Sequence, residues 1–191
     1  MDGRVAIVTG ASRGIGRAIA ERLAGEGAAV ALVARTESEG TSRLPGSLDE
    51  AVAGIRERGG RAAAIAADLS RPEDVETVVA RAEAGLGPVD TLVNNAGVNF
   101  YGPALETPGR RYDLMFRIMV HATFRLCQLA VPPMVERGRG WVVNITSKQA
   151  RHPKGPPYPD WASDGCTPYG MCKAAIDRLS TGLAAELHGT G

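Results

Sequence analysis

The chain has 191 residues, of which 44% are hydrophobic and 23% are charged, and its formal net charge is +1. This length fits one domain, here 1–191, or one domain with a piece missing. The near-neutral charge argues against nucleic-acid or membrane partners, and we see no apolar run of bilayer-spanning length.

In chain order, the hydrophobic pattern predicts a strand at 5–8, a helix at 15–23, a strand at 30–33, a helix at 48–58, a strand at 62–66, a helix from about 71 to 84, a strand at 89–93, a helix at 108–134, a strand at 141–145 and a helix at 168–187. Ser47 with Glu50 and Ser70 with Glu73 have the spacing of capping boxes. Thr107-Pro108 and Thr167-Pro168 are typical of helix starts that place proline in the first turn. Two stretches, 36–46 and 149–165, are expected to be loops.

Short apolar strands that alternate with helices indicate a parallel sheet with both faces covered. Right-handed crossovers then give an α/β fold with a doubly wound parallel sheet, the Rossmann type, in three αβα layers.

Three glycines, Gly10, Gly14 and Gly16, stand between the first predicted strand and the first predicted helix. Glycine permits a tight turn and lets backbone N–H groups approach a pyrophosphate, and the helix N-terminus adds a partial positive charge. Strand before and helix after are the context that makes this pattern a predicted dinucleotide-binding turn.

The end of the second predicted strand reads Ala34-Arg35, where an NAD-binding chain usually has an acid. Arg35 can pair with a 2′-phosphate, and Arg13 in the glycine turn can flank it. The alternative is that both are surface arginines. We therefore predict NADP(H) in preference to NAD(H).

Tyr169 and Lys173 lie four residues apart on one predicted helix, so they share a face. An ammonium near a phenol favours the phenolate, which tunes Tyr169 towards a general acid/base role. Ser147, just past the last predicted strand, can bind a substrate oxygen on which charge develops. The alternative is an exposed lysine beside a packing tyrosine.

Taken together and in this order, these pieces resemble the short-chain dehydrogenase/reductase family. The matching residues are Thr9-Gly10-Ala11-Ser12-Arg13-Gly14-Ile15-Gly16, Asp68-Leu69, Asn94-Asn95-Ala96-Gly97, Ser147, and Tyr169 with Lys173. They extend over almost the whole chain.

The resemblance implies hydride transfer between NAD(P) and a carbonyl or secondary alcohol, with Tyr169 as proton donor or acceptor and Ser147 on the substrate oxygen. It assigns Lys173 to the nicotinamide ribose and to lowering the Tyr169 pKa. It implies that the remaining cofactor-binding positions are Gly10, Ser12, Arg13, Gly14, Ile15, Gly16, Arg35, Asp68, Leu69, Asn95, Ala96 and Gly97.

The same resemblance implies a homodimer or homotetramer formed through helices 108–134 and 168–187, and a small-molecule substrate. Leu44-Pro45-Gly46 and the long loop before Tyr169 resemble a hydroxysteroid-dehydrogenase-like subgroup. The substrate and the direction of reaction stay open.

Three features depart from the family pattern. At the position where the family has an Asn that holds a relay water, this chain has Met119. Its side chain cannot hold that water, although a carbonyl in a locally bent helix can, and nearby His121 is either a substitute or a partly buried helix residue.

The second departure is the distance from Ser147 to Tyr169, 22 positions, which is about nine more than the resemblance implies. The extra residues fall in the loop 149–165, with Tyr158 and Trp161. The loop is either a cover over the substrate mouth or a surface excursion.

The third departure is that the sequence stops at Gly191, whereas the family continues with further strands. We therefore expect the C-terminal part of the usual domain to be absent and strand 141–145 to be an exposed edge. A fragment, a truncated product and a chain without its tail all fit.

The cysteines and the start of the chain bear on location. Cys127, Cys166 and Cys172 show neither CxxC nor Cys/His spacing, and Met1-Asp2-Gly3-Arg4 lacks the layout of a signal peptide. We expect reduced thiols, no metal site and a cytoplasmic protein. Cys172 is either a reactive thiol or a small filler, and we favour the filler.

Two other classes compete with an enzyme. One is a dinucleotide-binding protein without turnover, which Met119 favours and the intact Ser147, Tyr169 and Lys173 oppose. The other is a structural partner that acts only through its long helices, since Leu114, Ile118, Leu126 and Leu129 are also typical of a core face.

Overall fold

Five parallel strands form one sheet in the order β3-β2-β1-β4-β5 in a computed structural model, which describes residues 1–38, 40 and 44–191. The strands are β1 (Val5–Thr9), β2 (Ala29–Ala34), β3 (Arg61–Ala66), β4 (Thr91–Asn94) and β5 (Trp141–Asn144). The strand order reverses between β1 and β4, and such a reversal leaves a crevice at the carboxyl ends of the strands. The predicted doubly wound sheet is confirmed.

Helices cover both faces of the sheet, because successive strand residues point to opposite sides. Val8, Val30 and Leu32 pack against α1 (Gly14–Gly25) and α2 (Leu48–Glu57).

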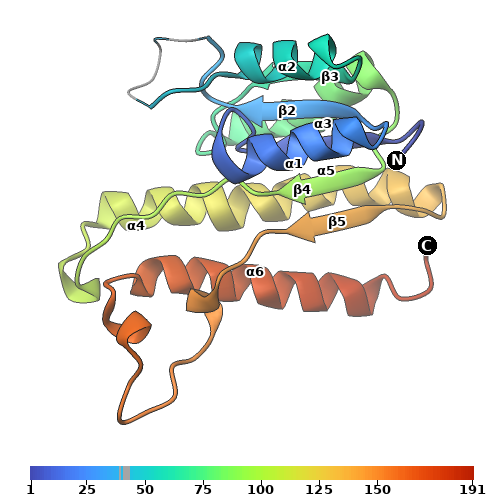
Figure 1. Cartoon of the computed structure of the whole chain (residues 1–191). Helices are drawn as coiled ribbons and strands as arrows, with labels where there is room; N and C mark the ends of the chain where they lie inside the picture. The colour runs from blue at the N-terminus through green and yellow to red at the C-terminus, as the bar shows by residue number, and fades with distance from the viewer. Residues whose placement is uncertain (39, 41–43) are drawn as a thin grey trace.

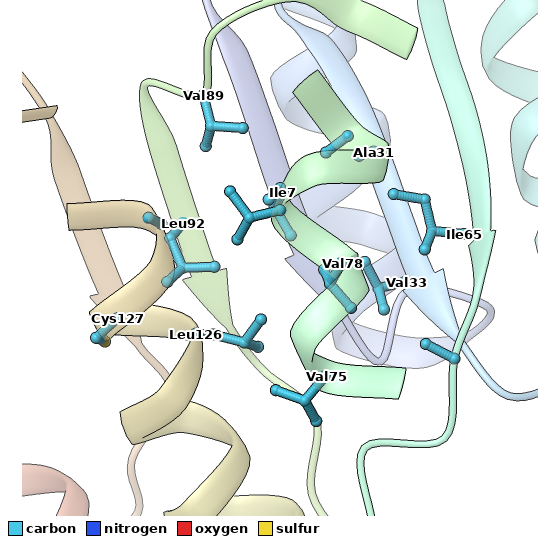
Figure 2. Packing of buried hydrophobic residues seen from close by; sticks show 14 of the residues in the cluster. Ile7, Ala31, Val33, Ile65, Val75, Val78, Val89, Leu92, Leu126 and Cys127 are labelled. Carbon is cyan, nitrogen blue, oxygen red and sulfur yellow. The ribbon is translucent and has the colours of Figure 1, made fainter. Parts of the chain in front are cut away.

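Ile7, Val33 and Leu92 point the other way, to α3 (Pro72–Leu86) and α5 (Ala122–Glu136). Figure 2 shows the second layer, with Val78 of α3 and Leu126 of α5 against these strand residues.

The predicted helix 108–134 is interrupted. It consists of α4 (Gly109–Phe116), a π-helical turn at Arg117–His121, and α5. A π turn inside an α-helix inserts one extra residue and often marks a functional site. The last helix, α6 (Thr167–Glu186), lies beside β5 and contacts the π turn (Figure 1).

The expectation that no apolar stretch is long enough to span a membrane is wrong. The helical stretch Gly109–Glu136 is long and apolar enough by composition, with a mean hydropathy of 1.3 over its most apolar window. Half of that window, 50%, is buried, and Ala122, Leu126 and Cys127 pack in the core. We assign this stretch to the core of the domain.

The predicted helix starts hold only in part. Ser47 Oγ accepts from the backbone N–H of Glu50 at 3.2 Å, as expected, while the Glu50 carboxylate pairs with Arg17. The prediction of a capping box at Ser70 is wrong. The Ser70 hydroxyl donates to Asp68 Oδ1 at 2.8 Å instead, because the chain turns back at this point before α3 begins.

Both Thr-Pro starts are shifted by one residue, in opposite directions. Pro108, not Thr107, precedes α4, since the Thr107 hydroxyl donates back to the Pro103 carbonyl at 3.2 Å. Cys166, not Thr167, is the cap residue of α6, because its carbonyl accepts from the Gly170 N–H at 2.8 Å.

β5 is an edge strand among the described residues, as expected. Trp141 and Val143 expose 43% and 44% of their surface on the face turned away from α5 and α6. The Arg4 guanidinium lies 4.2 Å from the centre of the Trp141 ring. Of the predicted loop 36–46, residues 39 and 41–43 lie outside the described residues.

Candidate functional site

The glycine turn joins β1 to α1 and has the geometry that the sequence predicts. Gly10 and Gly14 have φ values of +67° and +56°, in the left-handed region that favours glycine. A Cβ on Gly16 would fall onto the Gly10 carbonyl oxygen and the Asn95 amide. The turn is therefore held close to the end of β4, with the N-terminus of α1 beside it.

Thr9 and Asn95 make the connection between the ends of β1 and β4. The Thr9 hydroxyl accepts from the backbone N–H groups of Asn95 and Ala96, both at 3.0 Å, and the Asn95 side-chain amide donates to the Thr9 carbonyl at 2.9 Å. The role of Thr9 was missed, although a hydroxyl residue at the end of a strand just before the glycine turn is a readable signal. Asn95 thus steadies the turn.

A cleft of about 330 Å³ opens at the carboxyl ends of the strands. Eight of the predicted cofactor positions line it: Gly10, Ser12, Arg13, Arg35, Asp68, Leu69, Ala96 and Gly97. Gly14, Ile15, Gly16 and Asn95 do not line it. Gly14, Ile15 and Gly16 are the first residues of α1, and Asn95 directly follows β4.

The two arginines differ in what they contact. Arg13 donates to the Thr36 hydroxyl at 3.0 Å and to the Gly46 carbonyl at 2.9 Å, so it holds the loop after β2 against the glycine turn. Arg35 is exposed and lines the cleft at the end of β2. Arg35 is therefore the better placed of the two to meet an anion in the cleft.

Asp68 lines the cleft from the segment just past β3. Its Oδ1 accepts from the Ser70 N–H at 2.9 Å, and its own N–H donates to Asp74 Oδ2 at 2.8 Å. These bonds fix the segment that carries Asp68 and Leu69 into the cleft.

Ser147, Tyr169 and Lys173 come together beside β5. Ser147 follows the strand, and its side chain lies close enough to Tyr169 to act on the pKa of the phenol. Lys173 is 3% exposed and donates from Nζ to the Ile145 carbonyl at 2.6 Å. Its Nζ lies 5.5 Å from the centre of the Tyr169 ring. The side chains of Tyr169 and Lys173 thus lie close to the segment that follows β5.

The electrostatics differ from the expectation. Burial raises the pKa of Tyr169, and the hydrogen bond from Ser147 opposes that rise. Burial lowers the pKa of Lys173, because the ammonium loses water. The expected lowering of the Tyr169 pKa by Lys173 does not prevail in this structure, since desolvation outweighs the influences that favour the phenolate.

The family model of the short chain dehydrogenases matches residues 4–191. The chain belongs to the short-chain dehydrogenase family.

Individual relatives agree with this assignment. A protein of Pseudocercospora fijiensis named short chain dehydrogenase is 39% identical over 100% of this chain and 57% of its own length. The hydroxysteroid dehydrogenase-like protein 2 of Bos taurus is 30% identical over 98% of this chain and 43% of its own length. The chain therefore spans little more than half the length of the first of these relatives, and less of the second.

A solved structure of a metagenomic short-chain oxidoreductase, in complex with NADP, superposes with a TM-score of 0.85. It is 33% identical, over 100% of this chain and 79% of that one. The fold is thus that of the short-chain dehydrogenases.

Met119, at the position where the family resemblance implies an Asn, lies inside the π turn and is fully buried. Its side chain packs against Gly97. A Cβ added to Gly97 would lie 3.5 Å from the Met119 sulfur. The expectation of a partly buried His121 is wrong. His121 is exposed, because the extra residue of the π turn places it on the outer face between α5 and α6.

A chain of polar side chains, missed in the sequence, links β4 and β5 to α6. Asn94 Nδ2 donates to Asn144 Oδ1 at 2.9 Å, and Asn144 Nδ2 donates to Ser180 Oγ at 2.8 Å. Asn94 and Asn144 are register partners at the ends of β4 and β5. Asparagine at the last position of two successive strands was the available signal.

Cys172 is a packing residue. It is fully buried beside Met115, Met119 and Ile176, and burial raises the pKa of its thiol to about 11. A thiol that stays protonated at neutral pH is a poor nucleophile. The filler interpretation is confirmed.

The loop 149–165 is folded back on the start of α6. Gln149 Nε2 donates to the Trp161 carbonyl at 3.2 Å, and Trp161 helps to line a hollow of about 220 Å³ against Thr167 and Met171. Tyr158 is 63% exposed.

Proposed function

We propose that this chain is an NADP(H)-dependent oxidoreductase that transfers a hydride between the nicotinamide and a carbonyl or secondary alcohol, with Tyr169 as general acid/base. The observation that carries the proposal is the meeting of Ser147, Tyr169 and Lys173 at the sheet end that also holds the glycine turn. Membership of the short-chain dehydrogenases and the NADP in the related structure support it.

The residues present fit a dinucleotide. The glycine turn leaves no room for side chains at Gly10 and Gly16, so backbone N–H groups at the start of α1 can approach a pyrophosphate. Asp68 and Leu69 would flank the adenine, and Ala96 and Gly97 would line the nicotinamide half of the cleft. When bound, the nicotinamide supplies or accepts the hydride.

The chain's own residues would handle the proton. In the direction of reduction, Tyr169 Oη donates its proton to the carbonyl oxygen, and the Ser147 hydroxyl holds that oxygen while negative charge develops. Lys173, whose charge is costly to bury, would bind the ribose. A raised pKa keeps Tyr169 protonated at neutral pH, which suits a proton donor.

Met119 enters the proposal through its backbone. The π turn at Arg117–His121 redirects backbone carbonyl groups in the helix. One of these carbonyls can hold the relay water that the resemblance assigns to an Asn. Met119→Leu keeps an apolar side chain and the backbone, so turnover should stay within about twofold of wild type. Steady-state kinetics check this, and a loss of turnover above tenfold would assign the role to the side chain instead.

Preference for NADP(H) would come from Arg35, the exposed arginine at the end of β2. Arg35→Ala should weaken NADPH binding by roughly tenfold to a hundredfold and NADH binding by less than about threefold, because only NADPH carries the 2′-phosphate. Isothermal titration of both nucleotides measures this. Arg22→Ala, which removes an exposed ion pair with Glu26, is the matched control and should change neither affinity. Equal losses for both nucleotides in Arg35→Ala would refute the preference.

The function itself is tested by NADPH oxidation with a panel of ketones and aldehydes, and NADP reduction with the corresponding alcohols. Turnover of any member supports an enzyme. Stabilisation by NADPH without turnover on the whole panel supports the dinucleotide-binding alternative, which the Ser147–Tyr169 contact disfavours. Saturation at a hundred times Kd adds about 2.7 kcal/mol to the free energy of unfolding.

Location and assembly are part of the proposal. We infer a cytoplasmic homodimer or homotetramer, joined through the groove between α5 and α6 that His121, Phe124 and Leu179 help to line. The exposed Phe124, at 48%, supports a protein contact there. Analytical ultracentrifugation decides the assembly, and a monomer at micromolar concentration would refute it. Membership of a hydroxysteroid-dehydrogenase-like subgroup is supported by the bovine relative.

A further inference from the structure

The loop that follows β4 contacts both the cleft and the segment before α6 within a few residues of each other. Ala96 and Gly97 line the cleft, and Asn99 then reaches the segment just before α6. Asn99 Nδ2 donates to Cys166 Sγ at 3.4 Å, and the Gly102 N–H donates to the Gly165 carbonyl at 3.0 Å. Figure 1 shows the loop before α4 and the loop before α6 at the same end of the molecule.

The contact between the two segments is tight. Gly165 has a φ of +67°, and a Cβ there would lie 2.9 Å from the backbone N and O of Gly102. Cys166 is 7% exposed, and its thiol also lies 3.6 Å from the Asp164 carbonyl, in donor geometry. The thiol thus accepts from one segment and donates within the other.

Cys166 is also the cap residue of α6. Its carbonyl accepts from the Gly170 N–H at 2.8 Å, which closes the first turn of the helix around Tyr169. On the other side of that turn, the Gly170 Cα faces the Gln149 carbonyl so closely that a Cβ would overlap it. The first turn of α6 is therefore clamped between the loop after β4 and the turn after β5.

The hydrogen bond from Asn99 to Cys166 costs free energy elsewhere in the same side chain. The Asn99 Oδ1 is buried and has no hydrogen-bond partner among the described residues. A buried amide oxygen without a partner costs free energy, so a structural role alone is better served by an apolar side chain.

We propose that Asn99 is a positioning residue for Tyr169. Through the Cys166 thiol it couples the loop that lines the nicotinamide half of the cleft to the helix turn that carries the phenol. It thereby sets the distance between the site of hydride transfer and the site of proton transfer. This inference rests on the function proposed above.

The test is a double-mutant cycle with Asn99→Ala and Cys166→Ala, read out as kcat, KM and the Kd of NADPH. Misplacement of a reacting group lowers kcat, so each single variant should lose roughly tenfold in kcat while the Kd of NADPH stays within about twofold. The double variant should lose no more than either single variant, because both remove the same contact. Cys166→Ser keeps a donor and an acceptor and should recover kcat to within about threefold of wild type.

Thr107→Ala is the matched control. It removes a side-chain hydrogen bond within the same loop, to Pro103, without touching α6, and should change no kinetic constant. Additive losses in the double variant, or a Kd of NADPH that rises in step with the fall in kcat, would overturn the proposal, since they indicate general loosening.

Amide hydrogen exchange at Gly170 gives a readout that does not need turnover. Exchange should be at least about tenfold faster in Asn99→Ala than in Thr107→Ala, because the cap that holds this N–H is released. Unchanged exchange overturns the inference even if no substrate is found. Absence of turnover in wild type, with faster exchange in Asn99→Ala, counts against the proposed function and supports the clamp.

Discussion

Tyr169→Phe should lower turnover by roughly 10³-fold and leave NADPH binding unchanged, because it removes only the proton-transferring hydroxyl. The ring, which packs beside Met115, Met119 and Cys172, keeps its volume. The Ser147 hydroxyl keeps the hydrogen bond that it accepts from the Gln149 N–H at 3.3 Å, so the free energy of unfolding should change by less than about 1 kcal/mol. Single-turnover kinetics at saturating NADPH, beside titration of NADPH, separate the two effects.

The control for this variant is Tyr112→Phe. Tyr112 stacks against Phe116 in α4 with ring centres 4.6 Å apart, and removal of its hydroxyl keeps that contact. Its turnover should match wild type. If Tyr169→Phe turns over within tenfold of wild type, Tyr169 is not the general acid/base, and another group must supply the proton.

Gly16→Ala should abolish NADPH binding in a protein that still folds. The added Cβ overlaps the Gly10 carbonyl and the Asn95 amide, so the glycine turn must move away from the end of β4. Overpacking of this kind costs about 1–3 kcal/mol in the free energy of unfolding. The displaced atoms belong to the turn that would bind the pyrophosphate. We expect the stabilisation of about 2.7 kcal/mol at a hundred times the wild-type Kd to disappear.

Gly25→Ala is the matched glycine control. Gly25 is the last residue of α1, with open space where a Cβ would lie. This change should keep NADPH binding and raise stability by about 0.5–1 kcal/mol, since alanine is the better helix former. Thermal melts with and without NADPH compare both variants, after circular dichroism confirms the fold. Wild-type binding by Gly16→Ala would show that the pyrophosphate lies elsewhere.

Local pattern was enough for much of the site. The glycine turn needs only a strand, a small-residue turn and a helix in succession, and all three are local in sequence. Tyr169 and Lys173 share a face because they are four residues apart on a helix. Ser47 caps α2 because the cap depends on residues three apart.

Contacts between distant residues were not predictable in the same way. Asn94, Asn144 and Ser180 form one hydrogen-bonded chain although 50 and 36 positions separate successive members. Cys166, the cap residue of α6, is contacted by Asn99 of the loop after β4, 67 positions earlier. Local propensity contains no information on either neighbour.

The sequence by itself determined the parallel sheet, the glycine turn and the pairing of Tyr169 with Lys173, because these depend on short-range periodicity and backbone freedom. Only the tertiary structure decided the π turn at Met119, the exposure of His121 and the rise in the Tyr169 pKa. Those depend on which side chains meet across elements and on how much water they lose, and packing alone determines both.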